Sequence, residues 1–144
     1  MIELSKEALR SYALASVAIA LLLALLSFAT AAVRVRRKQF VNPEDASRFS
    51  TAVADAEHPD VQRVKRAHTN LLENASAFFV IGALYVVTGA TPRGALAYFG
   101  FFVAARLLHV LFYLRGVQPW RTISHVASLA AILGMMVHVV RAAW

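Results

Sequence analysis

The chain contains stretches without charged side chains that are long enough to cross a lipid bilayer as helices. Neither residues 12–33 nor residues 122–140 contain Lys, Arg, Asp or Glu. A membrane-spanning helix needs about 20 mostly apolar residues. The chain is 59% hydrophobic and only 16% charged, which excludes an ordinary soluble domain. The stretches are rich in Ala and Leu and lack two-residue alternation, so we expect helices rather than strands.

Proline residues and charges divide the chain into four predicted spans. A basic collar, RVRRKQF, follows the first span, and Pro59, Pro92 and Pro119 each stand where a later helix would begin. The first span is too long and too poorly flanked for a cleaved signal peptide, so we expect it to be retained. The predicted fold is an all-α integral membrane four-helix bundle, a single domain over residues 1–144. Its spans are expected at about 10–36, 60–91, 92–115 and 119–142.

The predicted loop at about 37–59 indicates the orientation of the bundle. Its segment NPEDA places Asn42 as a helix N-cap with Pro43 behind it, which predicts a short surface helix. The end of the bundle with this loop carries ten Lys and Arg residues and the opposite end carries four. This bias places the loop in the cytoplasm and both termini on the far side.

The net charge of +7 is explained by this topology and by contact with anionic lipid, so we expect no nucleic-acid partner. The chain has no cysteine, which excludes disulfides and thiolate metal ligands, and we expect no metal site. A bacterial inner membrane is favoured because the chain is compact and Ala-rich and lacks a retrieval signal. The endoplasmic reticulum is the alternative.

Polar side chains from all four spans are predicted to converge at one level near the cytoplasmic end. Side chains three or four residues apart share a helix face, so polar residues at this spacing form a stripe. The second span has the stripe Arg66, Asn70 and Glu73, and the third has the stripe Arg106, His109 and Tyr113. The fourth span places Arg121, Thr122 and His125 at the same depth, and Arg34 ends the first span there. These four sets together are called the stripes.

These stripes contain more positive than negative charge. A charged group inside a bilayer costs roughly 2.5 to 3.5 kcal/mol, so such groups usually turn inward and pair. One interpretation is a purely structural ion pair between Arg106 and Glu73. However, the stripes hold four arginines and Glu73 is their only acid. This excess favours an anionic ligand that carries carboxylates and an amine for Glu73.

Three segments carry a resemblance to a known family. RVRRKQFVNPEDA, DVQRVKRAHTNLLEN and ARLLHVLFYLRGVQPWRT resemble the corresponding stretches of the membrane-associated enzymes of eicosanoid and glutathione metabolism, the MAPEG family. The resemblance implies a homotrimer that binds glutathione between neighbouring subunits, on the cytoplasmic side. It also implies an enzyme, a transferase, isomerase or peroxidase, that acts on a lipophilic electrophile or peroxide taken from membrane lipid.

The resemblance also implies roles for individual residues. Arg121 and Thr122 would lie beside the glutathione sulfur, and Asp45 would orient Arg121 or move a proton, unless it only caps its helix. A thiol with a pKa near about 8.5 is stabilised as thiolate by a nearby Arg⁺, a donated hydrogen bond and a helix N-terminus. The glutathione-binding residues would be Arg34, Arg66, Asn70, Glu73, Arg106, His109, Tyr113 and His125.

The chain departs from the prostaglandin-synthesising branch of the family at the predicted site. That branch has arginine, serine and tyrosine where this chain has Thr69, Thr122 and His125, and the segment 115–118 is one residue shorter here. These differences leave the electrophile open among an endoperoxide, a lipid hydroperoxide and a hydrophobic xenobiotic.

Two other classes of function are considered. A non-catalytic lipid-binding scaffold of the same fold is the main alternative, but it has no need for Arg121, Thr122 and the stripe RAHTNLLE. A haem carrier would use facing histidines, and His138 has no histidine partner at its depth on another span. His68 lies beside the arginine stripe and is expected to have a structural role, with a hydrogen bond to the loop or to a neighbouring helix.

Overall fold

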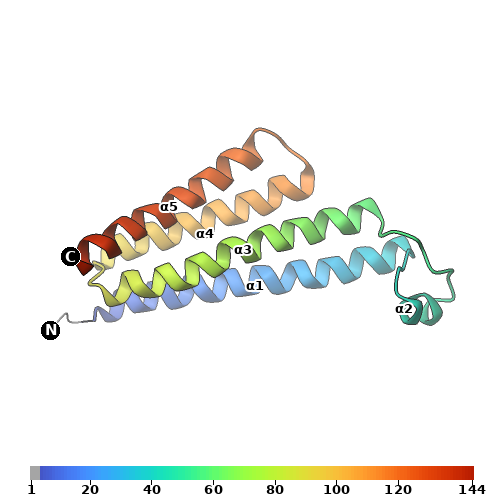
Figure 1. Ribbon diagram of the computed structural model, residues 1–144, viewed down its shortest axis with the longest axis horizontal. Helices are drawn as coiled ribbons and strands as arrows, with labels where there is room; N and C mark the ends of the chain where they lie inside the picture. Colours follow the sequence, from blue (N-terminus) through green and yellow to red (C-terminus); the bar gives the residue numbers. More distant parts are fainter. Residues whose placement is uncertain (1–3) are drawn as a thin grey trace.

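The computed structural model describes residues 4–144, which form five helices and no strand (Figure 1). The four long helices have the length and composition to cross a membrane. This confirms the predicted all-α class and defines an integral membrane protein. The helices are α1 (Lys6–Arg37), α2 (Pro43–Arg48), α3 (Pro59–Val87), α4 (Pro92–Arg115) and α5 (Trp120–Ala143).

Side-chain caps begin three of the long helices, and at the start of α3 the cap is Nδ1 of His58, which accepts from the N–H of Asp60 at 3.1 Å. The hydroxyl of Ser5 accepts a hydrogen bond from the backbone N–H of Ala8 at 3.2 Å at the start of α1. The hydroxyl of Thr91 accepts one from the N–H of Gly94 at 3.1 Å at the start of α4. These bonds satisfy N–H groups that have no partner inside the helix.

Three predicted boundaries differ from the structure. The first span begins at Lys6 rather than near residue 10, because Ser5 provides a cap. The second ends at Val87 rather than near residue 91, because Gly89 turns the chain with a φ of 90°. Pro119 is the N-cap of α5 and not its first residue.

The predicted surface helix is confirmed as α2, and Asn42 is its N-cap. The Asn42 side chain makes no cap hydrogen bond to the backbone. Its amide instead donates to Oδ2 of Asp45 at 3.3 Å. Asp45 is therefore held within the first turn of α2.

The long helices are arranged as two antiparallel pairs, α1 with α3 and α4 with α5 (Figure 1). The start of α1, the end of α5 and the α3–α4 turn lie at one end, which confirms that the first span begins and the last span ends on the same side. The pairs diverge toward the other end, where the loop with α2 projects. Helix α3 contacts α1, α4 and α5, and helix α4 contacts α1, α3 and α5. Helices α1 and α5 make no contact with each other.

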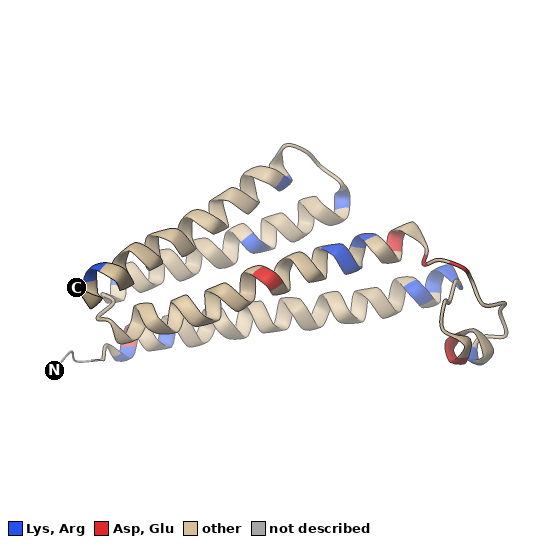
Figure 2. Ribbon diagram, viewed as in Figure 1, with Lys and Arg blue, Asp and Glu red and all other residues tan. Residues whose placement is uncertain are grey.

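Helix α1 is longer than a bilayer requires. Its 32 residues extend about 48 Å, whereas the hydrocarbon layer is about 30 Å thick. The basic end of α1 therefore extends past the level at which α4 and α5 are joined (Figures 1 and 2).

Aromatic side chains fill the core where the helices converge. Phe78 and Phe102 stack with ring centroids 4.3 Å apart, and Phe99 meets Phe78 edge to face at 5.7 Å. A Cβ at Gly134 would lie 2.5 Å from the Tyr98 ring, so glycine allows α4 and α5 to approach closely. The aromatic contacts thus join α3 to α4, and the close approach at Gly134 packs α4 against α5.

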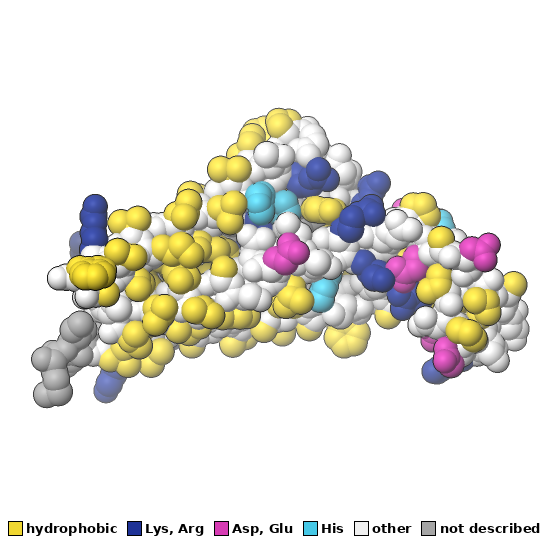
Figure 3. Space-filling model, viewed as in Figure 1, with side chains coloured by type: hydrophobic (Ala, Val, Ile, Leu, Met, Phe, Trp, Pro, Cys, Tyr) yellow, Lys and Arg dark blue, Asp and Glu magenta, His cyan; other side chains and the backbone are white. Residues whose placement is uncertain are grey.

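Large apolar side chains cover much of the outer surface (Figure 3). Helix α1 in particular exposes a continuous apolar face. Such a face suits contact with lipid chains or with another apolar helix. The exposed residues on it include Leu14, Val17, Leu21, Leu25 and Phe28.

Candidate functional site

A fully buried arginine forms the centre of a polar cluster between α3, α4 and α5. Arg106 has no exposed surface. Its Nη1 donates to Oδ1 of Asn70 at 3.2 Å, and its Nη2 donates to Nδ1 of His125 at 3.1 Å and to the hydroxyl of Ser128. The predicted convergence of Asn70, Arg106 and His125 is therefore confirmed.

No carboxylate in the described part of the chain neutralises Arg106. Within residues 4–144 its partners are neutral side chains and a backbone carbonyl, and Glu73 forms no ion pair. The structural Arg106–Glu73 ion pair considered from the sequence is absent from this part of the chain. The cluster thus keeps a net positive charge, and its Arg106 Nε is buried without a partner.

His109 connects this cluster to the first turn of α5. Its Nδ1 donates to the backbone carbonyl oxygen of Arg121 at 2.9 Å, and its ring lies 5.5 Å from that of His125. Because Nδ1 carries the proton, Nε2 is the acceptor of a neutral imidazole. Nε2 is buried and makes no hydrogen bond in the described chain. It is therefore available to a donor from a ligand or from water.

The Arg121 side chain is held on two sides. Its guanidinium lies over the Tyr113 ring, 4.9 Å from the centroid. Gln118 flanks it as well: with the carboxamide oxygen facing the guanidinium, Oε1 accepts from Arg121 Nε at 3.1 Å and from Nη2 at 2.7 Å. This orientation is required because arginine offers only donors. The Gln118 amide N–H then donates to the hydroxyl of Thr122 at 3.1 Å.

Glu73 and Arg66 are exposed residues of α3, three residues after and four residues before Asn70. Within residues 4–144, the one hydrogen bond of the Arg66 side chain is to the amide oxygen of Gln62, at 3.4 Å. Glu73 lies at the edge of an apolar groove of about 360 Å³ between α3 and α5. The remaining lining residues are Asn74, Ala77, Leu129, Ile132, Leu133 and Met136.

Two predicted site residues lie away from Arg121 within one chain. Arg34 is ion-paired with Glu57 at 2.5 Å, just before α3 begins, whereas Asn70 lies about three turns into α3. Asp45 is on α2, which packs against no long helix. Within one chain, the expected convergence of all four spans is therefore not met by α1, because Arg34 near the end of this long helix pairs with Glu57 of the loop.

Two histidines outside this cluster, His68 and His138, also make polar contacts. His68 lies 3.2 Å from the hydroxyl of Ser27 on α1, which confirms the expected bond to a neighbouring helix. Nε2 of His138 lies 3.4 Å from the carbonyl oxygen of Thr88, and its ring packs against the Tyr85 ring. Within residues 4–144, no group of three His, Cys, Asp or Glu side chains is arranged to hold a metal.

Two residues of the cluster were not predicted. Ser128 follows Arg121 and His125 at the spacing i, i+4 and i+7, so the same helical periodicity identifies it. Gln118 lies in a loop without periodicity, and only the fold places it beside Arg121 and Thr122.

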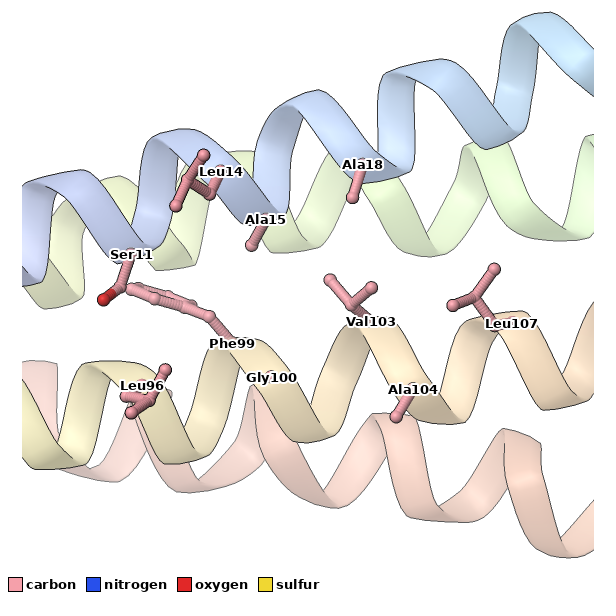
Figure 4. Close-up of a pocket in the computed structure, with 10 residues that line it drawn as sticks. All are labelled: Ser11, Leu14, Ala15, Ala18, Leu96, Phe99, Gly100, Val103, Ala104 and Leu107. Atoms are coloured by element: carbon pink, nitrogen blue, oxygen red, sulfur yellow. The ribbon is translucent and has the colours of Figure 1, made fainter.

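An apolar groove between α1 and α4 lacks the groups for polar chemistry (Figure 4). It holds about 340 Å³, and the hydroxyl of Ser11 is the only polar side-chain group among its lining residues. Leu14, Leu96, Val103 and Leu107 face it from the two helices. The groove suits an apolar chain and provides no charge to a reacting group.

Comparison with known proteins identifies the family. Residues 12–141 match the MAPEG family. The chain is 40% identical to human microsomal glutathione S-transferase 1 over 116 residues, which cover 77% of this chain and 75% of the transferase. It is 32% identical to human prostaglandin E synthase over 123 residues, which cover 85% of this chain and 81% of the synthase. The chain therefore belongs to the MAPEG family and is a membrane enzyme of that type.

Proposed function

We propose that the protein is a glutathione-dependent enzyme that bonds the sulfur of glutathione to a lipophilic electrophile, or uses the thiol to reduce a lipid hydroperoxide or to isomerise an endoperoxide. The observation that carries the proposal is the buried cluster around Arg106, which holds positive charge without a carboxylate partner in residues 4–144. The names of the relatives, a glutathione transferase and a prostaglandin synthase, support the same class of reaction.

The residues present fit this ligand. Glutathione has two carboxylates, one ammonium group and several amide N–H donors. The chain offers the guanidinium groups of Arg66 and Arg121, the carboxylate of Glu73, which forms no ion pair within residues 4–144, and the buried acceptor Nε2 of His109. An excess of arginine over acid matches a ligand with net negative charge.

The binding roles follow from charge. We assign the ammonium group of glutathione to Glu73 and its carboxylates to Arg66 and Arg34. His109 and Tyr113 support the backbone of the ligand. Arg106 lies behind this surface and holds Asn70 and His125 in place.

Arg121 and Thr122 stabilise the reactive sulfur. Glutathione supplies the thiol that attacks the electrophile. Arg121 offers a positive charge and Thr122 offers a hydroxyl hydrogen, and both favour the thiolate. They are the second and third residues of α5, so the helix dipole adds to the effect. Their backbone N–H groups already bond to Val117 and Pro119, so the side chains and the dipole provide the stabilisation.

We propose that the site is completed by a neighbouring subunit of a homotrimer. Within one chain α1 makes no contact with α5, so Arg34 reaches Arg121 only if the two come from different copies. The exposed apolar face of α1 provides a surface for such an interface. Asp45, on the loop that follows α1, would approach the same site from the neighbouring copy. The proposed location is a bacterial inner membrane, with the site toward the cytoplasm.

A subunit-complementation assay tests this proposal. Arg34→Ala and Arg121→Gln subunits are purified separately and then mixed under conditions that allow exchange in detergent. Each variant alone is expected to have low glutathione-dependent activity toward an aryl chloride, a lipid hydroperoxide or an endoperoxide. Mixed trimers contain a site with both arginines intact, so activity should return in part.

The alternatives give different results. Native mass spectrometry that detects only monomer or dimer would contradict the trimer. If differently tagged subunits show that exchange took place but mixing restores no activity, both arginines of one site come from the same chain. A wild-type protein that binds lipid but shows neither glutathione binding nor turnover would be the non-catalytic scaffold.

A further inference from the structure

Gln118 contacts both residues proposed to stabilise the thiolate. Its amide oxygen accepts from Nε and Nη2 of Arg121, and its amide N–H donates to Oγ1 of Thr122. One side chain thus joins the two groups by three hydrogen bonds of 2.7 to 3.1 Å. Gln118 lies before the first turn of α5, in the loop that follows α4.

We propose that Gln118 is a positioning residue that directs the hydroxyl hydrogen of Thr122 and one free edge of the Arg121 guanidinium toward the bound sulfur. The inference rests on the proposed function, because it requires a thiolate at this place. It adds a residue to the site and assigns its action to the orientation of two neighbours.

The argument for Thr122 depends on its single hydroxyl hydrogen. A hydroxyl donates one hydrogen bond and accepts others. Because the Gln118 N–H already fills an acceptor position on Oγ1, the Thr122 hydrogen remains free for another acceptor. In the opposite amide orientation Thr122 would donate to Gln118, but the Gln118 amino group would then face the Arg121 donors. The charge of Arg121 therefore selects the orientation that frees the hydroxyl.

The argument for Arg121 depends on which of its donors are occupied. Gln118 binds Nε and Nη2, which form one edge of the guanidinium, and the Tyr113 ring covers a face. Among residues 4–144, Nη1 has no hydrogen-bond acceptor. The guanidinium is thus fixed in rotation while one nitrogen stays free for an anion.

The step that benefits is ionisation of the thiol. The S–H bond breaks, its electron pair stays on sulfur, and the proton passes to water. Arg121 Nη1 and the Thr122 hydroxyl then donate to the thiolate. If Gln118 is lost, both groups gain rotational freedom and stabilise the anion less.

The test measures the pKa of the bound glutathione thiol by its thiolate absorbance in purified wild-type and variant protein. Gln118→Ala is expected to raise this pKa by about half a unit to one unit, the equivalent of about one hydrogen bond. At saturating glutathione and neutral pH, kcat toward an aryl chloride should fall about three- to tenfold, while the glutathione Kd changes less than about twofold. Gln118→Glu should raise the pKa further, because it places a negative charge beside the thiolate.

Gln39→Ala is the matched control. The Gln39 amide donates to the carbonyl oxygen of Ala56 at 2.8 Å, at the same end of the bundle, and it has no contact with Arg121 or Thr122. It should change neither the thiol pKa nor kcat. In a Thr122→Val background, Gln118→Ala should shift the pKa less than in wild type, because part of its action is through Thr122.

The outcomes separate the inference from the proposed function. A wild-type protein without a bound thiolate would overturn both. A wild-type thiolate whose pKa is unchanged in Gln118→Ala, even if Tm and Kd change, would overturn the inference alone and make Gln118 a structural residue. Equal pKa shifts from Gln118→Ala with and without the Thr122 hydroxyl would also overturn the proposed action on Thr122.

Discussion

The Nδ1–H of His109, on α4, donates a hydrogen bond to the backbone carbonyl oxygen of Arg121, in the first turn of α5, at 2.9 Å. This bond holds the backbone of Arg121 from the interior, while Tyr113 holds its side chain. The proposed thiolate-stabilising residue is therefore fixed by two residues of the neighbouring helix. Such support favours a preorganised site, because less orientation has to be gained during the reaction.

In the absence of glutathione, Ser128→Ala should lower the stability of the helical bundle. The Ser128 hydroxyl accepts from the buried guanidinium of Arg106, and no carboxylate in residues 4–144 replaces it. Loss of a hydrogen bond to a charged group costs about 1.5 to 3 kcal/mol. Thermal unfolding in detergent checks this. Ser76→Ala is the control, because the exposed Ser76 hydroxyl bonds only to the Leu72 carbonyl of its own helix. Equal Tm values for the two variants would contradict the prediction.

Glu73→Gln should weaken glutathione binding and leave the ligand-free fold intact. Glu73 makes no ion pair in residues 4–144, so neutralising it removes no internal salt bridge. If it binds the ammonium group of glutathione, the loss of charge costs roughly 1.5 to 3 kcal/mol, about tenfold or more in Kd. Calorimetric titration measures the Kd, and Tm without ligand shows whether the fold is affected. A fall in ligand-free Tm with an unchanged Kd would show a structural role instead.

The sequence predicted the site on α3, α4 and α5 better than the part on α1. Helical spacing identified Asn70, Arg106 and His125, because side chains three or four residues apart share one face whatever the neighbours are. The separation of Arg34 from this cluster within one chain was not predicted, because hydropathy does not determine how far a long helix extends beyond the bilayer. The contact of Gln118 with Arg121 was also missed, since a loop side chain is placed by tertiary structure and has no sequence period.

The ionised Glu57 should stabilise the folded protein at neutral pH, and this stabilisation should be lost in acid. Glu57 lies between α2 and α3 and accepts from Lys65 at 2.8 Å and from Arg34 at 2.5 Å. The hydrogen bond from Lys65, with the one from Arg34, lowers the pKa of Glu57 below its ordinary value of 4.5. The folded state therefore binds this proton less tightly than the unfolded state. The resulting stability is present above about pH 4.5 and is lost as the pH falls through the folded pKa.

Unfolding of Glu57→Gln as a function of pH checks this prediction. The variant should have a lower Tm than wild type at neutral pH, and the difference should shrink as the pH falls below about 4.5. Glu44→Gln, on the exposed surface of α2, is the control and should follow the wild-type profile. A difference between wild type and Glu57→Gln that is the same at every pH would assign the effect to packing.

Arg121 and Arg66 should affect different kinetic constants, although both are arginines on the same side of the bundle. Arg121 lies beside the Thr122 hydroxyl and in the first turn of α5, where a thiolate gains most. Arg121→Gln should lower kcat strongly with a modest change in glutathione affinity, the result expected when an interaction is made mainly in the transition state. Arg66 is an exposed residue of α3 whose one side-chain hydrogen bond within residues 4–144 is to Gln62, so Arg66→Ala should chiefly raise the glutathione KM. Steady-state kinetics at saturating glutathione separate the two cases. If Arg121→Gln regains full turnover there, Arg121 only binds the ligand, and Thr122 becomes the main stabiliser of the thiolate.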